Sequence, residues 1–258
     1  MGYKLFSPCE VKLVLTALKK LASLPVFYRW AQTVNPWFAS CTAILLACGI
    51  TKGLVFAPAD YQQGDSFRII YVHVPSAWMS LFTYIFMASA ALSVLVWRAK
   101  IAEIALRAAA PLGASFTFLA LATGSIWGKP MWGTWWVWDA RLTSELILLF
   151  LYLGIIALQN AIEERRVAAR AASVLTLIGL VNIPIIHYSV EWWSTLHQGP
   201  TVTKFDKPSI YIEMLIPLIL TSLGFMTYFF SVLFVKIQAG ILDYDRNSAW
   251  VRELCKPK

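Results

Sequence analysis

Long apolar segments alternate with short polar connections along this chain. The apolar runs cover about residues 37–56, 73–97, 108–126, 141–159, 171–190 and 210–236. A helix rises about 1.5 Å per residue, so that about 20 residues cross the roughly 30 Å of hydrocarbon in a bilayer. Each run is close to that length. The pattern therefore predicts an all-α integral membrane protein with six transmembrane helices.

Composition agrees with this prediction and limits the possible partners. The chain is 59% hydrophobic and only 14% charged, and its mean hydropathy is +0.63. Soluble domains carry more charge. A net charge of +8 would suit nucleic acid, but the Lys and Arg residues lie in short clusters between apolar runs, as residues that set membrane topology do. We therefore expect membrane lipid around the chain and no nucleic acid as a partner.

The distribution of Lys and Arg predicts the orientation of the six helices. Sixteen of the twenty-two lie on the side of the N-terminus, the two basic connections and the C-terminal tail; the other six are Lys52, Arg68, Lys129, Arg141, Lys204 and Lys207. By the positive-inside rule both termini are cytoplasmic. We expect a basic amphipathic segment at residues 1–34, a six-helix transmembrane domain at 35–237 and a cytoplasmic tail at 238–258.

A tryptophan-rich segment, residues 127–141, separates the third apolar run from the fourth. It contains five of the twelve tryptophans, punctuated by glycines: Trp127, Gly128, Trp132, Gly133, Trp135, Trp136 and Trp138. We expect an outward-facing loop rather than a span. Tryptophan offers a wide π-face and one N–H donor, which suits a planar, mostly apolar ligand. An interfacial belt is the alternative, but a belt needs only one or two rings per helix end.

The three histidines all lie near the predicted outer ends of helices. His73 opens the second span, His187 lies near the end of the fifth, and His197 follows in the next connection. Taken singly, each is best read as an ordinary interfacial histidine. Two imidazoles that flank an aromatic segment on one side of the membrane can supply both axial ligands of a haem iron. We assign these roles to His73 and His197, and expect His187 to cap or hydrogen-bond within the bundle.

Charged residues around the tryptophan-rich segment have both structural and functional interpretations. Asp139 stands where an N-cap of the fourth span is expected. Arg141 and Glu145 are four residues apart and could neutralise each other. Alternatively, Arg141 or Lys129 meets carboxylates of the ligand through charge-assisted hydrogen bonds. Glu213, near the outer end of the last span, is an acid with no evident partner and a candidate for function.

No sequence motif indicates a cysteine metal site, covalent haem attachment or nucleotide binding. The four cysteines form neither a CxxC metal site nor a CxxCH haem-attachment site. The stretch from Gly124 to Lys129 has one residue too few for a phosphate loop, and Pro130 stands where Ser or Thr belongs. With no nucleotide site in the sequence, we expect a binding or transport component rather than an enzyme.

Together these features resemble the cytochrome c maturation protein C family, also called haem exporter protein C. The resemblance rests on the WWD motif within the tryptophan-rich segment, on His73-Val-Pro before it and on the stretch from Trp192 to His197 after it, and it extends over residues 35–237. It implies that haem b is bound at the periplasmic face of the bacterial inner membrane. The axial ligands would be His73 and His197, and the cofactor-binding residues Trp127, Gly128, Trp132, Gly133, Trp135, Trp136, Trp138, Asp139 and Arg141.

The same resemblance implies a place in cytochrome c biogenesis. Members of the family present haem to a haem chaperone, cytochrome c maturation protein E. They associate with a small single-span protein D and with ABC transporter subunits A and B. Two other functions fit six apolar helices: a permease for haem or another small molecule, and a structural subunit whose tryptophan-rich segment docks a partner protein. A permease should show broken helices or an inverted repeat, and neither is evident in the sequence.

Overall fold

The computed structural model describes residues 23–193, 195–197, 199, 208–254 and 256. In this part of the chain every secondary-structure element of five residues or more is a helix. The elements are α2 (Leu24–Thr51), a π-helical turn η1 (Lys52–Phe56), a 3-10 turn η2 (Asp65–Ile69), α3 (Ile70–Trp97), α4 (Lys100–Trp132), α5 (Ala140–Ala161), α6 (Arg165–Gly179), α7 (Asn182–Trp192), α8 (Ile212–Tyr244) and α9 (Ala249–Leu254). They form six candidate membrane spans in the described residues, which confirms the predicted fold class.

Three helices are longer than the hydrophobic pattern predicts. α8 runs to Tyr244, so residues 238–244 continue the last span and the predicted start of the tail at residue 238 is wrong. The first span begins at Leu24, so that residues 24–34 continue the membrane helix; the rest of the predicted amphipathic segment, residues 1–22, lies outside the described residues. The third span continues through Trp127 to Trp132. Polar and aromatic residues extend these helices past the apolar core, because a helix satisfies its backbone hydrogen bonds whatever its side chains are.

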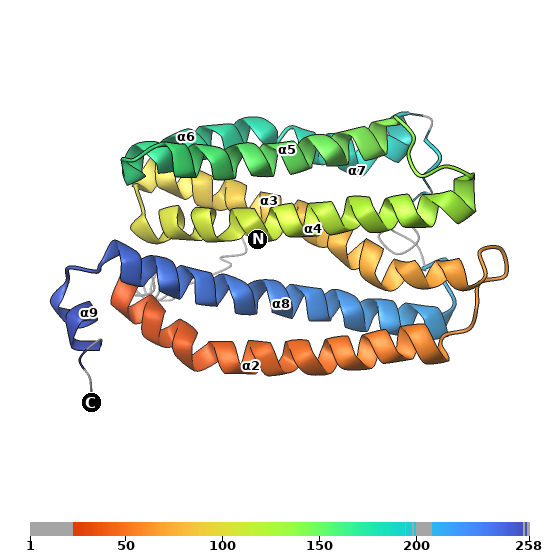
Figure 1. Ribbon diagram of the computed structural model, residues 1–258, viewed down its shortest axis with the longest axis horizontal. Coiled ribbons are helices and arrows are strands. Elements are labelled where there is room, and N and C mark those ends of the chain that lie inside the picture. The colour runs from red at the N-terminus through yellow and green to blue at the C-terminus, as the bar shows by residue number, and fades with distance from the viewer. Residues whose placement is uncertain (1–22, 194, 198, 200–207, 255, 257–258) are drawn as a thin grey trace, which may run out of the picture.

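The helices form three layers (Figure 1). α2 and α8 lie side by side along one edge, α5, α6 and α7 along the other, and α3 and α4 between them. Small residues permit the close approach of α2 to α8: a Cβ at Gly49 would come within 2.8 Å of Thr221, and one at Gly224 within 2.6 Å of Leu46. Helices in lipid associate through such contacts, because apolar side chains gain little by leaving lipid for protein.

The fifth span is made of two helices. α6 ends at Gly179 and α7 begins at Asn182, but the backbone between them stays helical through bonds of the 3-10 type from Leu180 to Leu177 and from Ile183 to Leu180. The Asn182 side chain donates to the carbonyl of Ser144 on α5 across 2.9 Å. This bond holds the interrupted span against its neighbour without unwinding it.

The two ends of the bundle differ in the connections they carry. At one end lie the turns around residues 57–64 and the loop 133–139; at the other lie the α3–α4 and α5–α6 turns, the start of α2 and the end of α8 (Figure 1). The start of the first span and the end of the last therefore lie at the same end of the bundle. That this end is cytoplasmic stays a prediction.

Candidate functional site

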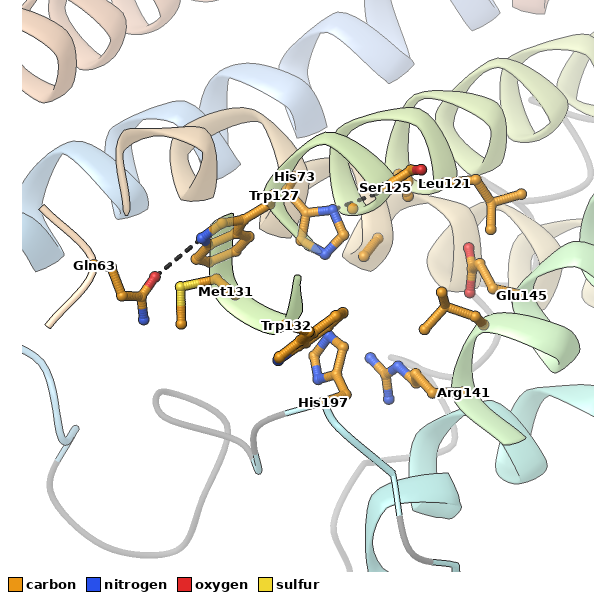
Figure 2. A pocket seen from close by; sticks show the side chains of 14 residues that line it. Gln63, His73, Leu121, Ser125, Trp127, Met131, Trp132, Arg141, Glu145 and His197 are labelled. Carbon is orange, nitrogen blue, oxygen red and sulfur yellow. Dashed lines mark hydrogen bonds between the residues drawn. The ribbon is translucent and has the colours of Figure 1, made fainter. Parts of the chain in front are cut away.

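A cavity opens among α3, α4, α5 and the connection that follows α7. It is lined by Gln63, His73, Ala77, Ala120, Leu121, Gly124, Ser125, Trp127, Met131, Trp132, Arg141, Leu142, Glu145 and His197. Figure 2 shows the two histidines, Arg141 and Glu145 around the same space. Most of the wall is apolar, with a few polar groups converging on it. This is the usual composition of a small-molecule site.

His73 is fixed by the neighbouring helix α4. Its Nδ1 lies 3.1 Å from the carbonyl oxygen of Ala120 and 3.1 Å from Oγ1 of Thr123. A carbonyl can only accept, so Nδ1 carries the proton and Nε2 is left with a free lone pair. This arrangement is typical of a metal-binding histidine, whose second nitrogen donates to a carbonyl or carboxylate.

Gly124 allows α4 to approach the His73 ring. A Cβ at this position would lie 2.9 Å from Cε1 of His73, closer than carbon atoms normally pack. Ala120, Thr123 and Gly124 were not expected from the sequence. Their spacing of three and four places them on one face of α4, but no pattern in the sequence says that His73 meets this face.

His197 faces His73 across the cavity. The two ring centroids are 6.4 Å apart and the ring planes are inclined by 36°. An imidazole nitrogen that binds a metal such as zinc lies about 2.0–2.1 Å from it, so two rings on opposite sides of one metal ion of that size have centroids about 6.5 Å apart. The separation fits one iron between the two histidines, and the donor set is that of a bis-imidazole haem.

Two tryptophans of the tryptophan-rich segment line the cavity, and both belong to α4. The Trp127 ring meets His73 edge-on at 5.6 Å, and its Nε1 donates to Oε1 of Gln63 across 3.0 Å. The Trp132 ring centroid lies 6.3 Å from that of His197. The prediction that residues 127–141 form one loop is therefore wrong. α4 continues past Gly128 and Pro130 and ends only at Gly133, whose φ of 75° is left-handed.

The remaining three tryptophans are not brought into the cavity. Trp135 and Trp138 are 56% and 74% exposed, and Trp136 packs against Trp138 with ring centroids 5.4 Å apart. All three follow Gly133, in the loop that leads to α5. Exposed rings at the end of a membrane bundle suit an interfacial belt. For this second half of the segment the belt interpretation stays a prediction.

Gly128 and Gly133 shape the end of α4 rather than line the cavity. A Cβ at Gly128 would lie 3.0 Å from the Trp132 ring and 3.3 Å from the carbonyl oxygen of Thr134. Gly128 therefore lets the Trp132 ring fold back on its own helix. The positive φ of Gly133 stops the helix at little strain, because glycine has no Cβ.

The polar residues at the start of α5 have distinct roles. Asp139 accepts a hydrogen bond from the Leu142 amide across 2.8 Å, which confirms the predicted N-cap. Arg141 donates to the carbonyl oxygen of Ile186 on α7, and Glu145 accepts from the Ser80 hydroxyl on α3. Arg141 and Glu145 form no contact ion pair within the described part of the chain, but their opposite charges act on each other at longer range.

Arg141 is the cation that faces the cavity. Lys129, the other residue considered for ligand carboxylates, is not among the lining residues, and its Nζ donates to the carbonyl oxygen of Gly133 across 3.0 Å. Lys129 thus helps to close the last turn of α4. Glu145, only 8% exposed, adds a carboxylate deeper in the cavity.

The remaining candidates lie outside the cavity. His187 is exposed on α7, where its ring meets that of Tyr188 at 4.8 Å, and no hydrogen bond holds it within the described bundle. Glu213 is exposed in the first turn of α8. A carboxylate is favoured there by the partial positive charge at a helix N-terminus, so Glu213 has a structural explanation.

Comparison with known proteins agrees with this site. Residues 17–252 match the model of the family described as Heme exporter protein C. Proteins of that name from Haemophilus influenzae, Escherichia coli K12 and Bradyrhizobium diazoefficiens are 56%, 53% and 49% identical to the chain. The alignments cover 89%, 92% and 86% of this chain and 93%, 96% and 84% of the relatives.

The six apolar helices and the bacterial relatives make this a multi-pass protein of the inner membrane. Its relatives are components of haem export and cytochrome c maturation, and they are not a known class of enzyme. The resemblance inferred from the WWD motif and the two histidines is confirmed. The chain belongs to the Heme exporter protein C family, which handles haem for cytochrome c maturation.

Proposed function

We propose that this protein binds haem b between His73 and His197 at the periplasmic face and delivers it to the haem chaperone, cytochrome c maturation protein E. The observation that supports this most is the centroid separation of 6.4 Å between the two imidazoles, in a cavity that Trp127 and Trp132 also line. That spacing suits two neutral imidazoles on opposite sides of one iron.

The cavity residues contribute to haem binding in different ways. His73 is oriented by Ala120 and Thr123, so its Nε2 is free to bind iron. The rings of Trp127 and Trp132 offer apolar surface to the macrocycle. Arg141, anchored through one nitrogen to Ile186, keeps further N–H donors for a propionate.

Delivery requires one edge of the bound haem to remain accessible. The loop 133–139 joins α4 to α5 beside the cavity and carries the exposed rings of Trp135 and Trp138. Exposed aromatic residues are common in protein interfaces. We infer that this loop receives the chaperone, whereas protein D and the ABC transporter subunits A and B complete the export system implied by the family name.

A transfer assay with purified components tests the proposal. The protein is loaded with haem, freed of excess haem and mixed with the apo-chaperone, and haem attached to the chaperone is followed by its absorption after denaturing electrophoresis. The proposal requires transfer from the wild-type protein and none from a His73→Ala, His197→Ala double variant. Equal transfer from both proteins would show that these histidines do not hold the delivered haem.

A permease is the alternative function, and the interruption between α6 and α7 is the feature of the fold that bears on it. The interruption keeps helical backbone angles and i to i+3 bonds, whereas carrier sites use unwound helices near the midplane. Haem flux into liposomes that hold this protein alone would support a permease. Flux that needs the ABC subunits would count against it.

A further inference from the structure

A second hollow lies at the end of the bundle opposite the histidines, between α4, α8 and the α5–α6 turn. We call it the polar cleft. It is lined by Glu103, Ile104, Arg107, Ala108, Pro111, Ile156, Gln159, Asn160, Ile162, Glu163, Arg165, Ala168, Ala169, Lys236, Ala239, Gly240, Asp243 and Tyr244. In Figure 1 this is the end where α8 finishes and α4 begins. None of the haem-site residues contributes to it.

The wall of the polar cleft holds equal numbers of cations and acids. The cations are Arg107, Arg165 and Lys236, and the acids are Glu103, Glu163 and Asp243. Arg165 and Asp243 form an ion pair at 2.6 Å. The other four charged residues form no ion pair within the described chain, but Glu103 lies close enough to Lys100 and Arg166 for their charges to act on it. Arg107, Lys236 and Glu163 therefore remain for a ligand.

Gln159 adds a largely buried polar side chain to the wall of the polar cleft. Its side chain is only 5% exposed, it lines the cleft, and its amide makes no hydrogen bond in the described protein. The amide atoms of Gln159 are not among the buried polar atoms that lack a partner in the described protein, so they still face the open space of the cleft. A ligand in the cleft can therefore accept a hydrogen bond from this amide.

Arg107 is already oriented toward this space. Its Nη2 donates to Oδ1 of Asn160, another lining residue, across 3.0 Å. Arg107 lies seven residues into α4, which places it about 10 Å along the helix from its start. Long cationic side chains near the ends of membrane helices reach the lipid headgroups.

The remaining wall is apolar and offers no side chain that commonly ligates haem iron other than Tyr244. The cleft extends toward the middle of the helices along Ile104, Pro111 and Ile156, and no His, Cys or Met lines it. The Tyr244 ring is covered by the cations of Lys100 and Arg165 at 5.3 and 5.7 Å. Such a wall suits an acyl chain rather than a second haem.

We propose that the polar cleft binds one phospholipid whose headgroup carries both a phosphate and an ammonium group. The phosphate bonds to Arg107, Lys236 and the Gln159 amide, the ammonium lies against Glu163, and an acyl chain follows Ile104 and Ile156. Arginine and lysine are the residues that bind phosphate in proteins. The Glu163 carboxylate beside the two cations favours a zwitterionic lipid over an anionic one.

Lipid retention by the full-length protein tests the proposal. The protein is purified in detergent, washed with excess detergent, and its phospholipid counted by extraction and by native mass spectrometry. We expect one phosphatidylethanolamine to remain per chain. An Arg107→Gln, Lys236→Gln double variant loses charge-assisted hydrogen bonds and should retain this lipid about ten-fold more weakly.

A matched control separates the site from general surface charge. Arg170 is an exposed cation on α6 that does not line the cleft, so Arg170→Gln should retain lipid as the wild-type protein does. Gln159→Leu keeps a side chain of similar size and removes only the amide, so it should weaken retention. Haem absorption at the other end of the bundle should be the same in all variants.

Three outcomes would overturn the proposal. The first is equal retention by the double variant and by Arg170→Gln. The second is greater thermal stabilisation of the wild-type protein by phosphatidylglycerol than by phosphatidylethanolamine, a comparison that needs no variant. The third is displacement of the retained lipid by added haem, which would make the polar cleft a haem site.

Discussion

Histidines and tryptophans occur both inside the cavity and outside it. The contrast between the inner and the outer residues defines the site better than any motif. His73 and His197 face each other inside, whereas His187 is exposed on α7. Trp127 and Trp132 line the cavity, but Trp138, a few residues later, is 74% exposed. The inner residues contact segments that are distant in the sequence, whereas His187 and Trp138 contact rings only one or two residues away. Residue type alone therefore does not identify a ligand in this fold.

The largest difference is expected between the inner histidines and the outer one. Replacing His73 or His197 with Gly removes an axial ligand, and should weaken haem binding by about 100-fold or more, since even outer-shell changes at metal sites cost 10–100-fold. His187→Gly should leave it unchanged. Absorption spectra during haem titration measure the effect, and added imidazole should restore the spectrum of the His73 and His197 variants. An unaltered spectrum without imidazole would remove these residues from the site.

The second contrast is between two cations. Arg141 faces the cavity, and Lys129 bonds to Gly133 at the end of α4. Arg141→Gln should weaken haem binding by about ten-fold, the cost of one charge-assisted hydrogen bond. Lys129→Gln should leave haem binding as it is. A haem analogue with esterified propionates provides the check, because it should bind wild type and Arg141→Gln alike.

The tryptophans provide the third contrast. Trp127→Leu and Trp132→Leu each remove a ring that lines the cavity, and should weaken haem binding by a few-fold to about ten-fold. Trp135→Leu and Trp138→Leu should bind haem normally and instead slow its transfer to the chaperone. Equilibrium titration and transfer kinetics on the same preparations distinguish the two effects. If the Trp135 and Trp138 variants bound haem as weakly as the Trp127 and Trp132 variants, the division of the tryptophan-rich segment into a cavity-lining half and an exposed half would be wrong.

The smallest effect is expected from two glycines. A Cβ at Gly124 would press on the His73 ring at 2.9 Å, whereas one at Gly154 would meet only Leu175 at an ordinary 3.5 Å. Gly124→Ala should lower haem affinity about five-fold, near the low end of the cost of overpacking. Gly154→Ala should bind haem like wild type. The same loss in both variants would indicate a general effect on the bundle.

Much of the fold could be predicted because it depends on local pattern. Apolar runs of about 20 residues specify spans wherever they occur, since lipid requires every backbone bond to be made within the segment. The helix limits were harder to predict. The end of α4 depends on the left-handed backbone of Gly133 rather than on Gly128 or Pro130, and hydropathy does not distinguish between glycines.

The sequence by itself determined the six helices, the two histidines and the tryptophan-rich segment. Only the tertiary structure decided which side chains meet: that Ala120, Thr123 and Gly124 hold His73, that two of the five clustered tryptophans line the cavity, and that Gln159 lies at a second, charged hollow. The reason is physical. Helix formation depends on neighbours along the chain, whereas a site depends on the faces that separate helices turn toward one another.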